Sequence, residues 1–484
     1  MTESLGDFTD EEMRAQLHRV ADWIASYRAT IEDRAIVPSV QPGEIAAKFA
    51  LAAPREGAEM EDVMRELDAL IMPGIVHWGH PAFLGYFGST SNGPALLGEM
   101  IAAALNVSAM TWRTSPAATE LEGVVVAWIR ELVTLPESFM GIVYDTASVA
   151  LMHALAAARE VAGGEIRKRG LAGRGNELRP LRVYASDQAH SSVEKSMIVL
   201  GLGEENVVRV KSDEHFRMDV AELGRMMAAD LASGYRPMAV VATVGTTSTA
   251  SIDPVAEIAA VCRARDVWLH VDAAYGGALA MLPERRNVMA GAELADSVVV
   301  NGHKWLFVPL DFSVLYIRRP DVLRSVFSLV PEYLRGDADA KGSVDYMDYG
   351  IQLGRRFRAL KAWMAIRAFG REGMEARIRE HCRLAELFAS WVEREPYYSI
   401  AAPVTMAVVC FRFSPEGLDE DAADALNERI VEAVNAGGDA YLTHTTLRGR
   451  RVMRIGVGNV LTTERHLELA WKRIREAGER LSRN

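Results

Sequence analysis

The chain has 484 residues, of which 49% are hydrophobic and 25% charged, and its formal net charge is −11. This length and composition are typical of a globular protein with a large core and about three units of ordinary domain size. The acidic balance argues against a nucleic-acid partner or a membrane-surface partner, and no apolar run is long and uncharged enough to span a bilayer. The three cysteines are far apart and form no C-x-x-C pair, so we expect a reducing, cytoplasmic compartment and neither a disulfide framework nor a metal site.

Residues 1–85 are predicted to form an N-terminal helical segment. Thr9 and Glu12 have the spacing of a capping box, and Phe8 and Met13 that of a hydrophobic staple. A stripe of apolar residues at helical spacing follows as far as Ile31, and a second helix is expected over residues 60–72. Because two such helices have little core of their own, we expect them to lie against another surface, such as a second subunit.

The stretch from Trp78 to Trp112 is dense in aromatic and small residues, among them Tyr86, Phe87 and Ser89. One interpretation is a core segment with a turn, which composition alone favours. The other is the aromatic wall of a ligand pocket, since such pockets are mostly apolar with a few polar groups.

Residues 86–360 are predicted to form a large α/β domain in which strands and helices alternate. Several strands are near-continuous runs of Val, Ala and Leu, as expected for strands covered on both faces, and the intervening helices favour a mostly parallel sheet. The expected strands are Arg182–Ser186, Val207–Val210, Met238–Thr243, Val267–Asp272, Ser297–Asn301 and Ser313–Ile317.

A long polar loop, Leu329–Tyr349, follows the last of these strands and carries Tyr333 near its start. Loops of this length are usually lids or disordered segments. Residues 361–484 are predicted to form a small α+β domain. It would contain most of a long helical region over residues 355–393 interrupted at Gly370 and Gly373, two strands over residues 406–413 and 452–457, and a closing helix over residues 463–481.

Lys304 follows the apolar strand Ser297–Asn301 by three residues and is itself followed by Trp305, Leu306 and Phe307. Ligands bind at the carboxyl edge of open α/β sheets, and desolvation lowers the pKa of a lysine so that its amine can act as a nucleophile. The chemistry that uses such an amine is Schiff-base formation, above all with the aldehyde of pyridoxal phosphate (PLP). Most lysines are solvated surface groups, so the hypothesis depends on partner residues.

Candidate partners occupy other strand ends. Asp272 ends a strand and could pair with the pyridinium nitrogen of PLP, or could instead cap the next segment. His190 begins a helix after another strand, where its ring could stack on a cofactor. Phosphate binding needs amides and hydroxyls at a helix start, and these are available in Thr146-Ala147-Ser148, with Asn301 a further candidate.

Taken together, these residues resemble the group II PLP-dependent amino-acid decarboxylases, most closely the aromatic-L-amino-acid decarboxylases. The matching segments cover most of the chain in the family's order: His80-Pro81, Tyr86-Phe87, Thr114–Glu122, Ser186–Val193, Gly245-Thr246-Thr247, His270–Tyr275, Asn301–Trp305 and Leu353–Phe357.

The resemblance implies a type I PLP-dependent (aspartate aminotransferase-like) fold and a homodimer with shared active sites. It implies that Lys304 is the Schiff-base lysine, Asp272 the pyridinium partner, His190 the stacking base and Tyr333 the loop acid that protonates Cα after CO₂ leaves. By the same resemblance, two residues would line the ring and four would surround the phosphate and imine: Thr247 and Ala274, then Ala147, Ser148, Asn301 and His303.

The chain departs from the family pattern at three places. Tyr144–Val149 replaces a Gly-rich segment before the phosphate helix, and Gly88 and Met110 stand where animal members have proline and phenylalanine. A flexible Met110 in place of a flat wall changes the expected side-chain preference. Arg454, on a C-terminal strand, is a further candidate for a pocket or carboxylate contact.

The sequence therefore predicts PLP-dependent decarboxylation of an L-amino acid, with an aromatic substrate as first choice and an aliphatic one as alternative. An aromatic aldehyde synthase is the runner-up. Members with that activity tend to replace the loop tyrosine or the stacking histidine, whereas both Tyr333 and His190 are present here. A transaminase or a PLP-binding regulator on the same fold are weaker alternatives.

Overall fold

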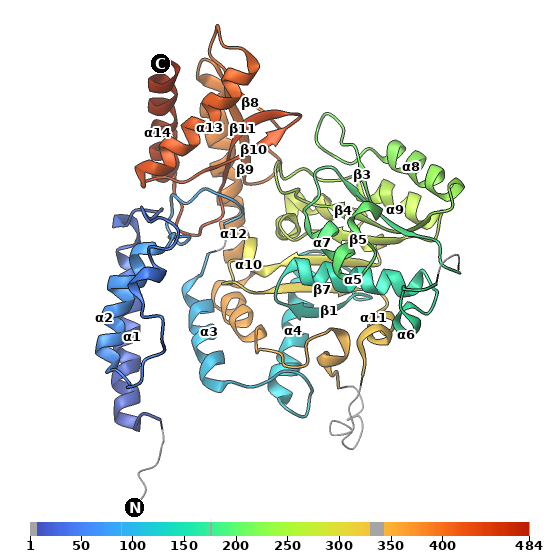
Figure 1. Cartoon of the computed structure of the whole chain (residues 1–484), viewed down its shortest axis with the longest axis horizontal. Coiled ribbons are helices and arrows are strands. Elements are labelled where there is room, and N and C mark those ends of the chain that lie inside the picture. Colours follow the sequence, from blue (N-terminus) through green and yellow to red (C-terminus); the bar gives the residue numbers. More distant parts are fainter. Residues whose placement is uncertain (1–6, 89, 175–176, 330–342, 484) are drawn as a thin grey trace, which may run out of the picture.

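The structure is a computed structural model, and it describes residues 7–88, 90–174, 177–329 and 343–483. Two sheets form its frame (Figure 1). The larger has the strand order β1-β7-β6-β5-β4-β2-β3. Its strands are β1 (Met140–Tyr144), β2 (Leu181–Ser186), β3 (Val207–Val210), β4 (Arg236–Thr243), β5 (Trp268–Asp272), β6 (Ser297–Asn301) and β7 (Ser313–Ile317).

The central pairings are parallel, as the sequence predicted. β3, β2, β4, β5 and β6 pair in parallel, whereas β7 runs antiparallel to both β6 and β1. The six predicted strands are confirmed to within two residues at each end. Strand β1 was not predicted, because its only partner, β7, lies far along the chain and local sequence does not reveal that pairing.

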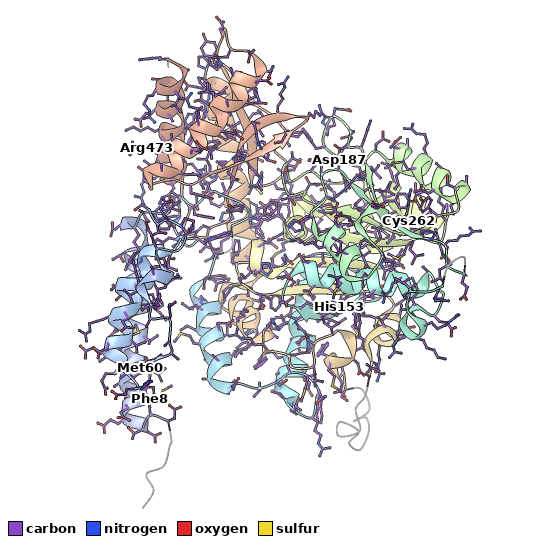
Figure 2. All side chains as sticks on the ribbon, in the orientation of Figure 1. Phe8, Met60, His153, Asp187, Cys262 and Arg473 are labelled. Atoms are coloured by element: carbon purple, nitrogen blue, oxygen red, sulfur yellow. The ribbon has the colours of Figure 1, made fainter. Side chains whose placement is uncertain are left out.

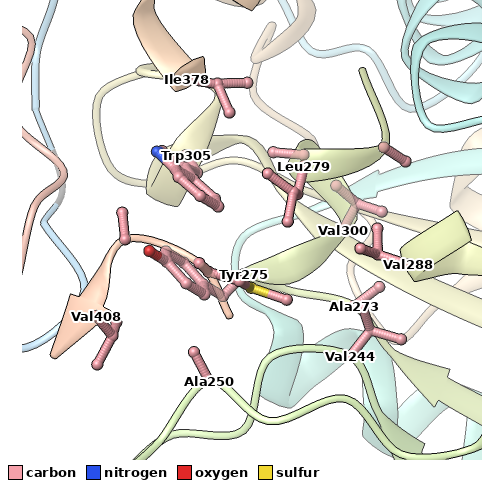
Figure 3. Packing of buried hydrophobic residues seen from close by; sticks show 14 of the residues in the cluster. Val244, Ala250, Ala273, Tyr275, Leu279, Val288, Val300, Trp305, Ile378 and Val408 are labelled. Atoms are coloured by element: carbon pink, nitrogen blue, oxygen red, sulfur yellow. The ribbon is translucent and has the colours of Figure 1, made fainter. Parts of the chain in front are cut away.

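Helices cover both faces of this sheet and bury its apolar strands. One face packs against α5, α7 and α11, and the other against α4, α8 and α9. Figure 3 shows part of the second core, where Tyr275 stacks on Trp305 with ring centroids 4.7 Å apart. The helices around the sheet are α3 (Gly93–Leu105), α4 (Pro116–Leu132), α5 (Ala147–Val161), α6 (Ile166–Arg169), α7 (Ser192–Val199), α8 (Val220–Ala232), α9 (Val255–Arg263), α10 (Gly302–Trp305) and α11 (Pro320–Phe327).

The C-terminal part forms a second, antiparallel sheet of order β10-β11-β9-β8. It is reached through α12 (Ala359–Arg394), which is broken at Gly370, where φ is +64°. This confirms the predicted interruption at Gly370, since glycine enters that region without strain, whereas the helix continues through Gly373. The remaining elements are β8 (Tyr398–Ile400), β9 (Val408–Phe413), α13 (Glu420–Gly437), β10 (Thr443–Leu447), β11 (Arg450–Gly456) and α14 (Glu464–Ser482).

The N-terminal helices α1 (Asp10–Ala29) and α2 (Met60–Glu66) lie along one side of the molecule (Figure 1). The predicted capping box of Thr9 and Glu12 is confirmed. Figure 2 labels Phe8, which lies two residues before α1, and Met60, the first residue of α2. No residue of α1 is buried within the chain, which agrees with the expectation that this segment lacks a core of its own.

A buried ion pair joins the large sheet to the segment that precedes α12. Arg355 contacts Glu122 on α4 through two hydrogen bonds, of 2.7 and 3.1 Å. Glu122 also accepts the backbone N–H of Val143 at 3.0 Å, and Arg355 donates to the carbonyl oxygens of Val143 and Ala109 at 2.8 and 3.1 Å. The pair therefore ties α4, β1 and the start of the long helical region together.

We expect Glu122→Leu to lower the free energy of unfolding by about 3–5 kcal/mol, because Arg355 would be left buried without its counter-ion. The denaturant midpoint of the cofactor-free protein measures this. Arg383→Leu is the control: it removes the more exposed Arg383–Glu380 pair and should cost less than about 1 kcal/mol. Equal shifts of the denaturant midpoint in the two variants would contradict a stabilising role for the buried Arg355–Glu122 pair.

Candidate active site

Asp272 and Lys304 meet at the carboxyl edge of the large sheet. Strands β5 and β6 are adjacent and parallel, with Asp272 opposite Val299, and Lys304 lies on α10, directly after β6. Both side chains line a cavity of about 200 Å³. All ten predicted cofactor-binding residues line this same cavity: Thr146, Ala147, Ser148, His190, Thr247, Asp272, Ala274, Asn301, His303 and Lys304.

Lys304 has the environment that a nucleophilic amine requires. The side chain lines both cavities, and burial lowers the pKa of Lys304. The charge of Asp272 opposes this shift in the pKa, and that of Arg454 adds to it. The Nζ atom lies 5.0 Å from the ring centroid of Phe87, which forms one apolar wall.

Asp272 makes the local backbone contact that the capping alternative predicted and also faces the cavity. One carboxylate oxygen accepts the backbone N–H of Ala274 at 3.0 Å and so shapes the turn after β5. The residue nevertheless remains partly exposed to the cavity. The carboxylate is therefore available to a cationic group of a bound ligand.

Two histidines present neutral rings with a defined tautomer. The Nδ1 atom of His190 accepts the N–H of Ser192 at 3.1 Å, and that of His303 accepts the N–H of Phe312 at 3.0 Å. In each neutral ring the proton therefore lies on Nε2. Burial lowers the pKa of His190, and burial with the charge of Lys304 lowers the pKa of His303 to about 4.

The opposite end of the cavity is suited to an anion. Thr146 caps α5 by accepting the N–H of Val149 at 3.4 Å, and Ala147 and Ser148 are the first residues of the helix. Their amides have no partner inside the helix and lie at its positive end. The amide oxygen of Asn301 accepts from Ser313 at 2.5 Å, so the amide nitrogen is the end that can donate.

This donor set fits PLP. A carboxylate for the pyridine nitrogen, an anion-binding helix start for the phosphate and a desolvated lysine for the aldehyde all line one cavity. The Oγ1 atom of Thr243 in the same lining is buried and has no partner among the described residues. A cavity with an unused donor of this kind is equipped for a polar ligand.

A larger cavity of about 660 Å³ shares Phe87, His190, Thr247 and Lys304 with the first, so the two cavities are adjacent. Trp78, Tyr86 and Phe87 form its aromatic wall, as the second interpretation of that stretch predicted, and Trp78 stacks on Tyr86 with centroids 5.4 Å apart.

Arg454 lines the larger cavity and is buried. It donates to the carbonyl oxygens of Tyr86 at 2.7 Å and Ser248 at 3.0 Å, and its guanidinium lies 4.9 Å from the ring centroid of Phe87. Within the described residues, Arg454 therefore fixes the segment that carries the aromatic wall.

Three predicted site residues are not brought to the cavities by the described structure. Ser89 and Tyr333 lie outside the described residues. Met110 lines neither cavity, and its carbonyl oxygen accepts the N–H of Met347 at 3.0 Å.

Residues from the C-terminal part complete the larger cavity, and the sequence analysis missed them. Tyr441 places its hydroxyl 3.3 Å from that of Tyr86, and Glu432, Asn435 and His444 line the same wall from α13 and β10. No local pattern could have identified them. Thr243 was also missed, although its place at the end of β4 could have indicated it.

Fold and site together define a type I PLP-dependent enzyme. A family model described as the pyridoxal-dependent decarboxylase conserved domain matches residues 42–414. The chain belongs to this family.

Curated relatives span nearly the whole chain. Tryptophan decarboxylase 2 of Oryza sativa subsp. japonica is 37% identical, with 96% of this chain and 94% of that protein covered. The aromatic-L-amino-acid decarboxylase of Sus scrofa is 37% identical and the phenylacetaldehyde synthase of Arabidopsis thaliana 38% identical, each with 96% of both chains covered. The solved structure of Oryza sativa TDC with PLP and tryptamine superposes with a TM-score of 0.94 at 34% identity, covering 99% of this chain and all of that one.

We expect Lys304→Ala to abolish the absorbance band near the visible edge that PLP bound to a lysine produces, because the variant lacks the amine that forms the Schiff base. Absorbance spectra of the PLP-loaded proteins measure this. Lys195→Ala, an exposed lysine on the neighbouring α7, is the control and should keep the band. A band that survives in Lys304→Ala would remove Lys304 from this role.

Proposed function

We propose that the enzyme decarboxylates an aromatic L-amino acid to the corresponding amine and CO₂. The observation that carries the proposal is that Phe87 of the aromatic wall and Lys304 line both cavities. The relatives named as tryptophan and aromatic-L-amino-acid decarboxylases support the same substrate class.

Bound PLP supplies an electron sink for the pair released at Cα. Lys304 would hold the cofactor aldehyde through its amine, and Asp272 would pair with the pyridine nitrogen and keep a proton on it. His190 would cover the ring with a neutral imidazole, and the start of α5 would hold the phosphate. Tyr333, by family resemblance, protonates Cα after CO₂ has left.

The aromatic wall favours a planar side chain. Phe87 is fixed from behind by Tyr275, with centroids 3.9 Å apart, and Tyr86 is held between Trp78 and Tyr441. Rigid aromatic surfaces bind a flat substrate at little cost in conformational entropy. An aliphatic side chain would leave much of the 660 Å³ cavity unfilled.

An aromatic aldehyde synthase is the second candidate, because the phenylacetaldehyde synthase of Arabidopsis thaliana is among the similar relatives and a 4-hydroxyphenylacetaldehyde synthase of Rhodiola rosea superposes with a TM-score of 0.90 at 33% identity. Such an enzyme releases ammonia and peroxide alongside CO₂. The presence of both Tyr333 and His190 leads us to propose amine as the product.

The decisive assay supplies purified enzyme and PLP with Phe, Tyr, DOPA, Trp, 5-hydroxytryptophan, Val, Leu or Glu, and measures CO₂, amine, ammonia and peroxide. We expect CO₂ and amine in equal amounts from one aromatic group. Amine from aliphatic substrates alone would keep the reaction and overturn the aromatic preference. A keto acid in excess of CO₂ would indicate a transaminase, and bound PLP without any turnover a regulator.

We expect Tyr333→Phe to lower amine formation by about 10²–10⁴-fold, the usual contribution of a general acid, because decarboxylation continues while protonation of Cα is lost. In air, aldehyde and ammonia should then appear, with O₂ as the oxidant and peroxide as its product. Product analysis by chromatography measures both. Unchanged amine output would show that Tyr333 is not the acid.

We further propose a homodimer with shared active sites, in which residues 1–85 form a dimer contact, residues 86–360 the PLP-binding domain and residues 361–484 the small domain. The support is apolar surface that the single chain leaves uncovered: α1 buries none of its residues, and Leu97, Ile101 and Leu105 are each about half exposed along one face of α3.

A cytoplasmic location is supported by the three cysteines, which are buried and free. Among the described residues, no helix has the length and apolar character to cross a membrane.

We expect Ile101→Glu to shift the protein from dimer to monomer, because a charge placed in a buried apolar contact is strongly unfavourable. Sedimentation velocity measures the change. Glu160→Gln, an alteration on the distant α5, is the control and should leave the dimer intact. A monomeric wild-type protein would contradict the dimer proposal.

A further inference from the structure

A buried histidine lies just below Asp272 in the sheet. His270 and Asp272 are two residues apart on β5, so their side chains share the face of the sheet that α5 covers. His270 has no exposed surface. Burial lowers the pKa of His270 to about 4, against the charge of Asp272, and the ring is therefore neutral under ordinary conditions.

Neighbouring hydrogen bonds fix which nitrogen of His270 carries the proton. The Oγ atom of Ser297 lies 2.9 Å from Nε1 of Trp268 and 2.9 Å from Nδ1 of His270. The indole N–H can only donate. Ser297 therefore accepts from Trp268, and among the described residues the only partner left for its own proton is Nδ1 of His270. Donation to that nitrogen pairs the hydroxyl and leaves the ring proton on Nε2.

That Nε2–H is buried and has no partner among the described residues. The comparably buried His381 differs: its Nδ1 accepts from Trp305 and its Nε2 bonds the carbonyl oxygen of Asn459, both at 3.0 Å. An unpaired buried donor costs stability, so its presence calls for a function.

A second unused donor lies on the other side of the same carboxylate. Thr243 is the register partner of Asp272 on β4, so the two side chains lie on one face. Its Oγ1 atom is buried without a partner among the described residues, and the residue is one of those around the cavity that would hold PLP. Two unpaired donors thus lie next to Asp272: the Nε2–H of His270, two residues earlier on β5, and the hydroxyl of Thr243 on the neighbouring β4.

We propose that His270, assisted by Thr243, is a positioning residue that holds the Asp272 carboxylate directed at the pyridine nitrogen of PLP. The Nε2–H of His270 donates to the carboxylate through one bridging water, and Ser297 and Trp268 fix the tautomer that makes this possible. The inference depends on PLP binding and not on the amino-acid substrate, so failure of the decarboxylation assay leaves it intact.

The test compares His270→Leu with His270→Gln. Leucine removes the unpaired Nε2–H but leaves the buried hydroxyl of Ser297 without its acceptor, so the melting temperature of the cofactor-free protein should change little. The dissociation constant for PLP should nevertheless increase about 10-fold, and the ¹⁵N resonance of pyridine-labelled PLP should move towards the unprotonated position. Glutamine can still donate a hydrogen bond, so His270→Gln should keep most of the wild-type PLP affinity and of the wild-type ¹⁵N shift. Unchanged PLP affinity and ¹⁵N shift in His270→Leu, or no recovery in His270→Gln, would overturn the proposal.

Two further variants serve as control and as independent test. Glu160→Gln, which alters the far end of α5, is the control and should leave PLP affinity unchanged. Thr243→Val is isosteric and should weaken PLP about 3-fold through loss of one hydroxyl donor. If His270→Leu does not fold, Thr243→Val decides: wild-type affinity and ¹⁵N shift in that variant would overturn the proposal.

Discussion

The parallel pairing of β5 with β6 is the constraint on which the site depends. Parallel neighbours end at the same edge of a sheet, so Asp272 at the end of β5 and Lys304 just after β6 are brought into one cavity. An antiparallel pairing would have sent the two to opposite edges. The strand direction reverses one strand later, at β7, which runs antiparallel to β6. None of the predicted catalytic side chains lies on β7.

Burial then determines the charge states within that cavity. It lowers the pKa values of Lys304, His190, His270 and His303, which leaves the lysine closer to its nucleophilic form and the histidines neutral. Asp272 opposes the shift in three of these groups. The site thus combines one carboxylate with neutral donors, an arrangement suited to holding a single positive charge on a bound heterocycle.

The substrate wall is assembled from segments that are remote in the chain. Phe83 bridges to Tyr441, the backbone of Leu84 bonds that of Tyr441, and Arg454 fixes the carbonyl oxygen of Tyr86. Residues 82–86 are therefore bonded to the C-terminal sheet, close to the proposed border between residues 85 and 86. The chemistry belongs to the large sheet, whereas the shape of the substrate cavity depends on how the C-terminal part packs against it.

The parallel strands, the cap of α5 and the places of Asp272, Lys304 and His190 at strand ends and helix starts could be predicted from the sequence, because strand ends and helix starts are marked by residues close together in the chain. The sequence did not reveal β1, the contribution of Tyr441, or the unpaired donors of His270 and Thr243. Those depend on which strands become neighbours and on which polar atoms are left without partners after packing. Only the tertiary structure decides this, since burial and hydrogen-bond pairing are properties of the whole fold and not of any one segment.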